Sequence, residues 1–351
     1  PLLSICIPTY NRINKLQKLI LNILDFPSQD IEVVVVNNAS TDNTLEVLSQ
    51  IKDGRLSIYS NDVNIGGMCN IIMSLSKSSG IYTLFCLDKD WIETVNLSRF
   101  ISVLSEHKNT ICGYCELDIL KEEPNEYFST GIDGIKHLGY LSKHPSGYFF
   151  RTYELHNSSL LQNFIFQKDS FDFCIDLLCT DLAAVGASCI VRFPLVFSAN
   201  FTAKYDIEPP IKTYTYTKDN VFFHPRQRMN ELYRYISHLS TLNIPKKNKK
   251  KLIYDLFQRG LIVSTLGYKK IMNNEAICSH YNIENKDISL LKLIIIDIKY
   301  CKYFVKSDIH ISWLEKIFVC ISDHIVLLVK KTLNTFIKNK NKLRGEKYDT
   351  F

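Results

Sequence analysis

The chain has 351 residues, of which 46% are hydrophobic and 22% are charged, with a formal net charge of +6. This globular composition allows one large domain or two ordinary ones. No apolar run reaches the roughly 18 to 20 residues of a membrane-spanning helix, and we expect no secretory signal peptide.

The eleven cysteines are an odd number scattered through apolar segments, for example at Cys6 and Cys86. This pattern indicates small buried side chains rather than a disulfide framework. Cys112 and Cys115 form a CxxC pair without a second pair at zinc-finger spacing, so we interpret the pair as structural. A reducing, cytoplasmic setting follows, with attachment to a membrane surface left open.

The first 92 residues alternate short apolar runs with segments of helical periodicity. Strands are expected at 2–7, 31–36, 56–59 and 81–87, and helices at 14–24, 44–51 and 69–76. This alternation predicts an α/β fold with a doubly wound, mainly parallel sheet. Each strand ends in polar residues, and parallel sheets bind ligands at the carboxyl ends of their strands. We therefore expect a nucleotide site at that edge.

The fourth expected strand leads directly into two carboxylates, Asp88 and Asp90, separated by Lys89. Alternate residues of an extended segment point the same way, so both carboxylates are expected to face one ligand. A divalent cation shared with substrate phosphates would compensate their charge. The alternative is a strand that ends in a solvated polar turn. The G-x-G-x-x-G and Walker A motifs are absent, which argues against a dehydrogenase and a P-loop phosphotransferase.

Four short motifs, each weak alone, follow one another in the first 90 residues. They are Ile7-Pro-Thr-Tyr-Asn-Arg12, Val36-Asn-Asn-Ala-Ser-Thr-Asp42, Asn64-x-Gly66-x-x-x-Asn70 and Leu87-Asp-Lys-Asp90. In order and spacing the chain resembles the family 2 glycosyltransferases, closely over 2–92 and loosely to about 230. The resemblance implies a GT-A type fold and an inverting enzyme of the kind that builds bacterial surface polysaccharides.

The resemblance also implies a site for a nucleotide diphosphate sugar. The donor-binding residues expected from it are Thr9, Tyr10, Arg12, Asn38, Asp42, Asn64, Gly66 and Asp88. Tyr10 offers a flat face to a base and Arg12 a fork to a phosphate, although each could be an ordinary surface residue. Asn38 stands where the family usually has a carboxylate. Its amide can still accept a hydrogen bond from a base, so a UDP-sugar is favoured while the base stays open.

For the cofactor, the resemblance implies Mn²⁺ or Mg²⁺, with Asp90 as the main ligand and Asp88 beside it. His224 is a candidate for a late metal ligand, and Arg226 and Arg228 are candidates for diphosphate contacts. A satisfied structural histidine is the alternative for His224.

On the acceptor side, Gly147 would permit close approach of a sugar and Tyr148 would stack on its ring. The alternative is a turn before a strand. A hydroxyl nucleophile needs a base, and the family places a carboxylate at the start of a helix. A helix is expected at 169–178, and Asp181 matches the base best, with Asp176 and Asp172 as further candidates. A helix cap is the alternative for Asp181.

From about residue 229 the pattern becomes helical, with helices expected at 229–242, 249–266 and 312–331. We therefore expect a glycosyltransferase domain at 1–228, with its nucleotide-sugar half at 1–92 and its acceptor half at 93–228, and a helical region at 229–351. An apolar stripe from Trp313 to Leu328 lies beside a basic tail. Contact with the domain core or a partner is the common role of such a stripe, and an interfacial membrane helix stays open.

Together these features predict a metal-dependent inverting glycosyltransferase. It would move one sugar from a nucleotide diphosphate sugar to a hydroxyl of a glycan acceptor in O-antigen or capsule synthesis. The acceptor would be lipid-linked at the cytoplasmic face of the membrane, with no nucleic acid partner, and a homo-oligomer stays open. The alternatives are a catalytically silent nucleotide-sugar-binding module and a sugar nucleotidyltransferase. The missing Gly-rich, Lys-bearing first loop argues against the latter.

Overall fold

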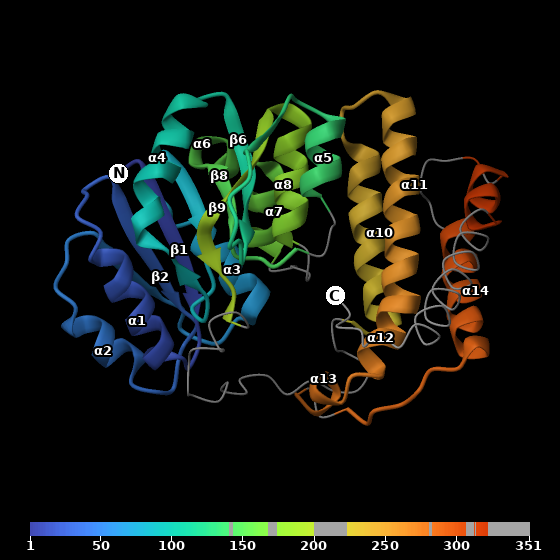
Figure 1. Ribbon diagram of the computed structural model, residues 1–351, viewed down its shortest axis with the longest axis horizontal. Helices are drawn as coiled ribbons and strands as arrows, with labels where there is room; N and C mark the ends of the chain where they lie inside the picture. The colour runs from blue at the N-terminus through green and yellow to red at the C-terminus, as the bar shows by residue number, and fades with distance from the viewer. Residues whose placement is uncertain are drawn as a thin grey trace. The chain divides into compact units, whose positions relative to one another are not determined.

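The computed structural model has two compact units (Figure 1). It describes residues 1–139, 143–167, 174–199, 223–280, 283–306, 312 and 314–321. Unit 1 consists of Pro1–Tyr214 with Leu242–Ile244, and unit 2 consists of Thr215–Thr241 with Pro245–Phe351. Unit 2 thus begins before the boundary at 228 that the sequence pattern suggests, and His224 belongs to it.

The first half of unit 1 is the parallel α/β array that the sequence predicts. Its strands are β1 (Leu3–Thr9), β2 (Ile31–Asn37), β3 (Leu56–Ser60) and β4 (Tyr82–Phe85), and its helices are α1 (Ile13–Leu24), α2 (Thr44–Gln50) and α3 (Gly67–Leu75). These strands pair in parallel in the order β3-β2-β1-β4. Thr9 pairs with Asn37, and Asn37 pairs with Ser60, so the carboxyl ends of the three strands are in register. The loops that follow them share one edge of the sheet.

The second half of unit 1 makes the sheet mixed. It contains β5 (Trp91–Ile92), β6 (Thr110–Leu117), β7 (Glu126–Phe128), β8 (Tyr148–Arg151) and β9 (Ala187–Phe197), with helices α4 (Leu97–Glu106), α5 (Ile132–Leu138), α6 (Thr152–His156), α7 (Ser159–Gln167) and α8 (Cys174–Val185). A short 3₁₀ turn, Thr94–Asn96, precedes α4. β8 runs antiparallel between β4 and β6, whereas β9 runs parallel to β6. The start of β8 therefore lies at the edge where β4 and β6 end.

The core of unit 1 is built from β-branched strand residues and the apolar faces of α1 and α4. Phe100 of α4 packs edge-on against Phe149 of β8, with ring centroids 5.3 Å apart. All eleven cysteines are free thiols. Burial raises the pKa of Cys115 well above its usual value, as expected for a structural thiol rather than a reactive one.

Unit 2 is helical. It contains α10 (Pro225–Thr241), α11 (Lys246–Ile262), a π-helical turn (Val263–Gly267), α12 (Tyr268–Met272), α13 (Glu275–His280) and α14 (Leu290–Lys306). The predicted helix at 312–331 is described only over 314–321, which is helical. Trp313 and the basic tail lie outside the described residues, so their predicted role stays a prediction. Within the described parts of the chain, no helix is long and apolar enough to cross a membrane.

Glu32 of β2 ties three segments together at the amino edge of the sheet. Its carboxylate accepts hydrogen bonds from Ser4 Oγ of β1 at 2.5 Å and from Ser79 N and Oγ at 2.8 and 2.9 Å. Burial raises the pKa of Glu32, but the hydrogen bonds from Ser4 and Ser79 outweigh burial and leave the pKa below its usual value. The ionised carboxylate therefore stabilises the fold above the unfolded-state pKa, and this contribution is lost as pH falls through the lower native pKa.

We expect Glu32→Gln to lower the free energy of unfolding by about 1 kcal/mol at pH 7, because charge-assisted hydrogen bonds become neutral at a half-buried site. The difference from wild type should shrink as pH falls through the lower native pKa, where the wild-type carboxyl also becomes protonated. Urea unfolding of wild type and Glu32→Gln at pH 7 and at pH 3 measures the difference in free energy of unfolding. Glu46→Gln, at an exposed position of α2, is the matched control. An equal loss for Glu32→Gln at pH 7 and pH 3 would contradict the role of its charge.

Candidate active site

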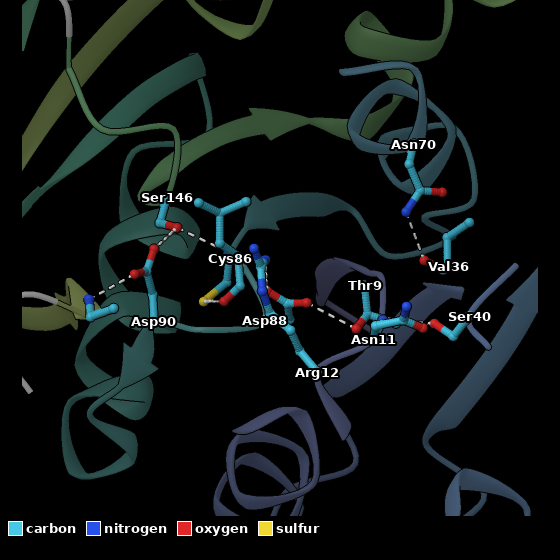
Figure 2. Close-up of polar contacts among 12 residues, drawn as sticks. Thr9, Asn11, Arg12, Val36, Ser40, Asn70, Cys86, Asp88, Asp90 and Ser146 are labelled. Atoms are coloured by element: carbon cyan, nitrogen blue, oxygen red, sulfur yellow. Dashed lines mark hydrogen bonds and ion pairs between the residues drawn. The ribbon is translucent and has the colours of Figure 1, made fainter. Parts of the chain in front are cut away.

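Asp88 is the buried carboxylate at the centre of the carboxyl edge. Its side chain is 1% exposed and pairs with the Arg12 guanidinium at 2.9 Å. Thr9 Oγ1, at the end of β1, donates to the other carboxylate oxygen at 2.9 Å (Figure 2). Burial raises the pKa of Asp88 above its usual value, although Arg12 and Thr9 act in the opposite direction. Three predicted donor-site residues, from segments almost eighty positions apart, thus form one cluster.

Asp90 has a separate set of partners. Its Oδ1 accepts the Ala199 N–H at 2.8 Å, and its Oδ2 lies 2.5 Å from His144 Nε2 and accepts a hydrogen bond from Ser146 Oγ. The side chain of Asp90 is buried, whereas that of His144 is 28% exposed. Asp90 is therefore bound to the segment before β8 and to the end of β9.

The carboxylates of Asp88 and Asp90 point in different directions, whereas the sequence pattern predicted that both would face one ligand. Figure 2 shows the Asp88 carboxylate directed toward Thr9 and that of Asp90 toward Ser146. The reason is that β4 ends at Phe85, and Asp88 and Asp90 lie in a turn closed by the Asp90 N–H on the Leu87 carbonyl at 3.0 Å. The alternation of an extended strand does not apply to a turn.

Asn38 is the centre of an amide network that joins the loops after β2 and β3. Its Nδ2 donates to Asn64 Oδ1 at 2.8 Å, while its Oδ1 accepts from Asn61 Nδ2 and Ile65 N, each at 3.0 Å. Asn61 also donates to Asn70 Oδ1 at 2.9 Å. An amide can donate and accept at once, which a carboxylate cannot. The amide at position 38 thus fits a network of amides, and its predicted contact with a base stays a prediction.

The loops after β1 and β2 are joined through Asn11, which has a left-handed backbone with φ 52°. Its Oδ1 accepts the Thr41 N–H at 2.7 Å. Its own N–H donates to Ser40 Oγ at 3.0 Å (Figure 2). Asp42 accepts the Thr44 N–H at 3.1 Å, so its carboxylate serves the start of α2.

Tyr10 is half-buried beside these loops. Gly66, with φ 87°, comes directly before α3, and its N–H donates to Asn64 Oδ1 at 2.9 Å. Because positive φ favours glycine, Gly66 keeps this loop in its turn.

Gly147 and Tyr148, the two predicted acceptor residues, are both buried in the fold. Gly147, with φ 99°, donates its N–H to Phe85 O at 3.0 Å, and a Cβ there would lie 2.5 Å from Cys115 O. It permits close approach of backbone strands. Tyr148 is fully buried, and its hydroxyl lies 2.6 Å from Asp176 Oδ1. Its ring therefore has no exposed face on which the predicted sugar could stack.

Asp181 does not lie at a helix start. The helix expected at 169–178 is observed as α8 at Cys174–Val185, so Asp181 lies in its second half, with Oδ2 3.4 Å from Ser158 Oγ. Asp176 is instead the acidic residue of the first turn of α8, and it is buried. Asp172 lies outside the described residues. Asp176, rather than Asp181, thus lies in the first turn of this helix.

A cavity of about 380 Å³ opens beside the partners of Asp90. Its lining includes Lys89, Tyr114, Glu116, Leu117, Asp118, Lys143, His144, Ser198 and Ala199. Lys143 lies over the Tyr114 ring, with Nζ 4.3 Å from the centroid, and burial lowers its pKa. Asp118, with φ 59°, is fixed by the Ser198 N–H and hydroxyl, both at 2.7 Å. The cavity thus places polar and aromatic groups next to the buried carboxylate.

Two neighbouring side chains, those of Asp90 and His144, could supply part of the coordination sphere of a divalent cation. Among the described residues, no group of three or more His, Cys, Asp or Glu side chains could hold a metal ion. Asp90 and His144, however, offer a carboxylate and an imidazole side by side, and substrate phosphates commonly complete such sites. His224 lies in unit 2, with its Nδ1 3.3 Å from Arg226 N and its ring facing Tyr268. Its predicted metal role stays a prediction.

His144 and Ser146 are the site residues that sequence reasoning missed, since their segment was assigned to the acceptor through Gly147 and Tyr148. Their signal was the pairing of an imidazole and a hydroxyl directly before a strand. It becomes informative only when that strand is known to be antiparallel, because then its start, rather than its end, lies at the ligand edge.

Comparison with known proteins agrees with this fold. Residues 4–161 match the family model described as "Glycosyl transferase family 2". An uncharacterized glycosyltransferase of Haemophilus influenzae is 30% identical over 124 residues, covering 34% of this chain and 50% of that protein. The Campylobacter jejuni GalNAc(5)-diNAcBac-PP-undecaprenol beta-1,3-glucosyltransferase is 27% identical over 177 residues, covering 49% of this chain and 56% of that protein. The chain spans about half the length of these relatives.

Among solved structures, Staphylococcus aureus TarS 1–349 in complex with UDP-GlcNAc superposes with a TM-score of 0.56 at 16% identity, covering 86% of this chain and 80% of that one. This likeness shows a shared fold, that of the GT-A glycosyltransferases. Over residues 4–161 the chain is therefore similar to glycosyl transferase family 2.

Proposed function

We propose that this protein transfers one sugar from a nucleotide diphosphate sugar to a hydroxyl of a lipid-linked glycan, with inversion at the anomeric carbon. One observation carries the proposal. The loops after β1, β2, β3 and β4 are joined by side-chain hydrogen bonds into one polar edge, and a cavity lies beside Asp90 at that edge.

The donor side of the proposal rests on Arg12 and Tyr10. The ion pair with Asp88 holds the Arg12 guanidinium at the edge, where its side chain is 20% exposed. A guanidinium in that position suits a diphosphate, since its planar fork matches phosphate oxygens. Tyr10 would place its ring against the base. A UDP-sugar is the proposed donor, because the structure of TarS with the same fold holds UDP-GlcNAc.

The cofactor in this proposal is Mn²⁺ or Mg²⁺, with Asp90 and His144 as its protein ligands. When bound, such an ion would neutralise charge on the leaving diphosphate. The protein's own contribution is positional: Ser146 and the Ala199 N–H hold the Asp90 carboxylate in one orientation, and His144 is the more exposed partner.

The acceptor would enter the 380 Å³ cavity, where the Tyr114 ring and the carboxylates of Glu116 and Asp118 can meet sugar hydroxyls. For the base, the first turn of α8 favours Asp176 over the predicted Asp181. Tyr148 OH holds Asp176, and Tyr148 follows the Ser146–Gly147 segment that contacts Asp90. Asp176 would accept the proton of the acceptor hydroxyl as the glycosidic bond forms and the diphosphate leaves.

The lipid-linked acceptor is proposed from the relative in Campylobacter jejuni, whose name specifies an undecaprenol-linked glycan. A role in surface polysaccharide synthesis at the cytoplasmic face of the membrane follows from such an acceptor. The basic character of the chain, with a formal net charge of +6, suits peripheral contact with an anionic surface.

Asp90→Asn should remove metal-dependent donor binding. We expect the affinity for a UDP-sugar in the presence of Mn²⁺ to fall at least about tenfold, because a neutral amide replaces the charged ligand. Calorimetric titration with and without Mn²⁺ measures this. Asp62→Asn, at an exposed position of the loop after β3, is the control and should bind as wild type. Full transfer activity in the presence of excess chelator would contradict the proposed role of the metal.

Asp176→Asn should reduce turnover by about 10²- to 10⁴-fold, the usual contribution of a positioned base. The amide keeps the size of the side chain and can still accept the Tyr148 hydroxyl, so the melting temperature and donor affinity should stay near wild type. Asp181→Asn, on the same helix, is the matched variant and should keep its turnover.

Collapse of turnover in Asp181→Asn, with normal turnover in Asp176→Asn, would return the assignment to Asp181. A product that retains the anomeric configuration of the donor, measured by NMR, would exclude the inverting mechanism itself.

A further inference from the structure

Unit 2 contains a second cavity, of about 720 Å³, that the transfer reaction does not use. Its floor is apolar and buried, with Phe223, Tyr268, Met272 and Ile288 from the core of unit 2. Its volume lies within the usual range of small-molecule sites. Such a floor suits a flexible hydrocarbon rather than a nucleotide or a sugar, because hydroxyl and phosphate groups would lose their hydration there.

One wall of this cavity is the face of α14 that carries Lys292, Ile296 and Lys299. Their spacing of four and three residues places them on one side of a helix. Both lysines are exposed and Ile296 is half-buried. The wall therefore changes from apolar to cationic between the floor and the opening.

The rest of the cavity rim also carries more cationic than anionic side chains. Arg226 is exposed in the first turn of α10, where the helix dipole also favours an anion. Lys286 lines the cavity and pairs with Glu284 at 2.5 Å. Glu284 is the single carboxylate among the described lining residues, against the four cations Arg226, Lys286, Lys292 and Lys299.

We propose that this cavity binds the lipid end of the acceptor, an isoprenyl chain with its phosphate at the basic rim. The inference rests on the lipid-linked acceptor of the proposed function. Two observations select this occupant: the apolar floor matches the chain, and the excess of cations matches the phosphate. Met229 and Met272 add adaptable side chains that can follow a flexible chain.

The test is direct binding of farnesyl phosphate to the full chain, measured by native mass spectrometry without donor or metal. Farnesol, inorganic phosphate and lysophosphatidate are the comparison ligands. We expect farnesyl phosphate to bind at least about tenfold more tightly than farnesol or phosphate alone, because only it matches both floor and rim. Asp90→Asn should bind it as wild type, so failure of the transfer reaction would not affect this result.

The double variant Lys292→Glu/Lys299→Glu should weaken farnesyl phosphate binding by about tenfold or more, since it reverses two charges at the rim. Lys251→Glu/Lys302→Glu makes the same change of net charge at exposed positions of α11 and α14 that do not line the cavity, and should bind normally. Ile296→Trp, which narrows the cavity, should weaken the binding of farnesyl phosphate and farnesol together.

Equal binding of farnesol and farnesyl phosphate would overturn the role of the basic rim. Equal loss in both double variants would show attraction by net charge only and would also overturn it. Preference for lysophosphatidate would assign the cavity to a membrane phospholipid instead of the acceptor. Absence of farnesyl phosphate binding in the wild type, while the UDP-sugar still binds, would overturn this inference and leave the proposed function intact.

Discussion

The buried ion pair between Asp88 and Arg12 is the interaction on which the active edge depends. A carboxylate that is 1% exposed is stable in its charged form only with a close counter-charge, and Arg12 supplies it at 2.9 Å from the loop after β1. The pair therefore fixes the loop after β1 against the turn after β4. Removing Arg12 would leave the buried Asp88 carboxylate without its counter-charge, and such a loss typically costs about 3 to 5 kcal/mol. The same contact thus stabilises the fold and holds a guanidinium at the proposed donor site.

A second constraint is the reversal of the sheet at β8. Because β8 runs antiparallel to β4 and β6, its first residues meet the ends of both neighbours. Ser146 uses this position twice: its hydroxyl accepts the Leu87 N–H at 2.9 Å and donates to Asp90. Gly147 then passes between Phe85 and Cys115 without a side chain. The segment directly before this short antiparallel strand thereby supplies two partners of Asp90, His144 and Ser146, and His144 also lines the cavity.

The parallel half of the sheet and its donor loops could be predicted from sequence, because hydrophobic periodicity and the rule for carboxyl ends are both local signals. They placed Thr9, Arg12 and Asp88 at one edge, where they are in contact. The direction of β8 has no local signal, so His144 and Ser146 were missed and the ring of Tyr148 was assigned to a ligand instead of the core. The phase of α8 was also uncertain, since a start at Cys174 rather than 169 changes which aspartate lies in the first turn.

The neighbouring carboxylates of Asp88 and Asp90 have different environments, which suit them to different roles. Asp88 pairs with Arg12 and accepts a hydrogen bond from Thr9, so the protein itself supplies its counter-charge. Its carboxylate thereby positions the Arg12 guanidinium. Asp90 faces neutral or titratable donors, namely the Ser146 hydroxyl, the Ala199 N–H and the His144 ring. These partners orient its negative charge without neutralising it as fully as a guanidinium would. In the proposed function, Asp90 would therefore be the ligand of the metal-bound diphosphate, while Asp88 would act through Arg12.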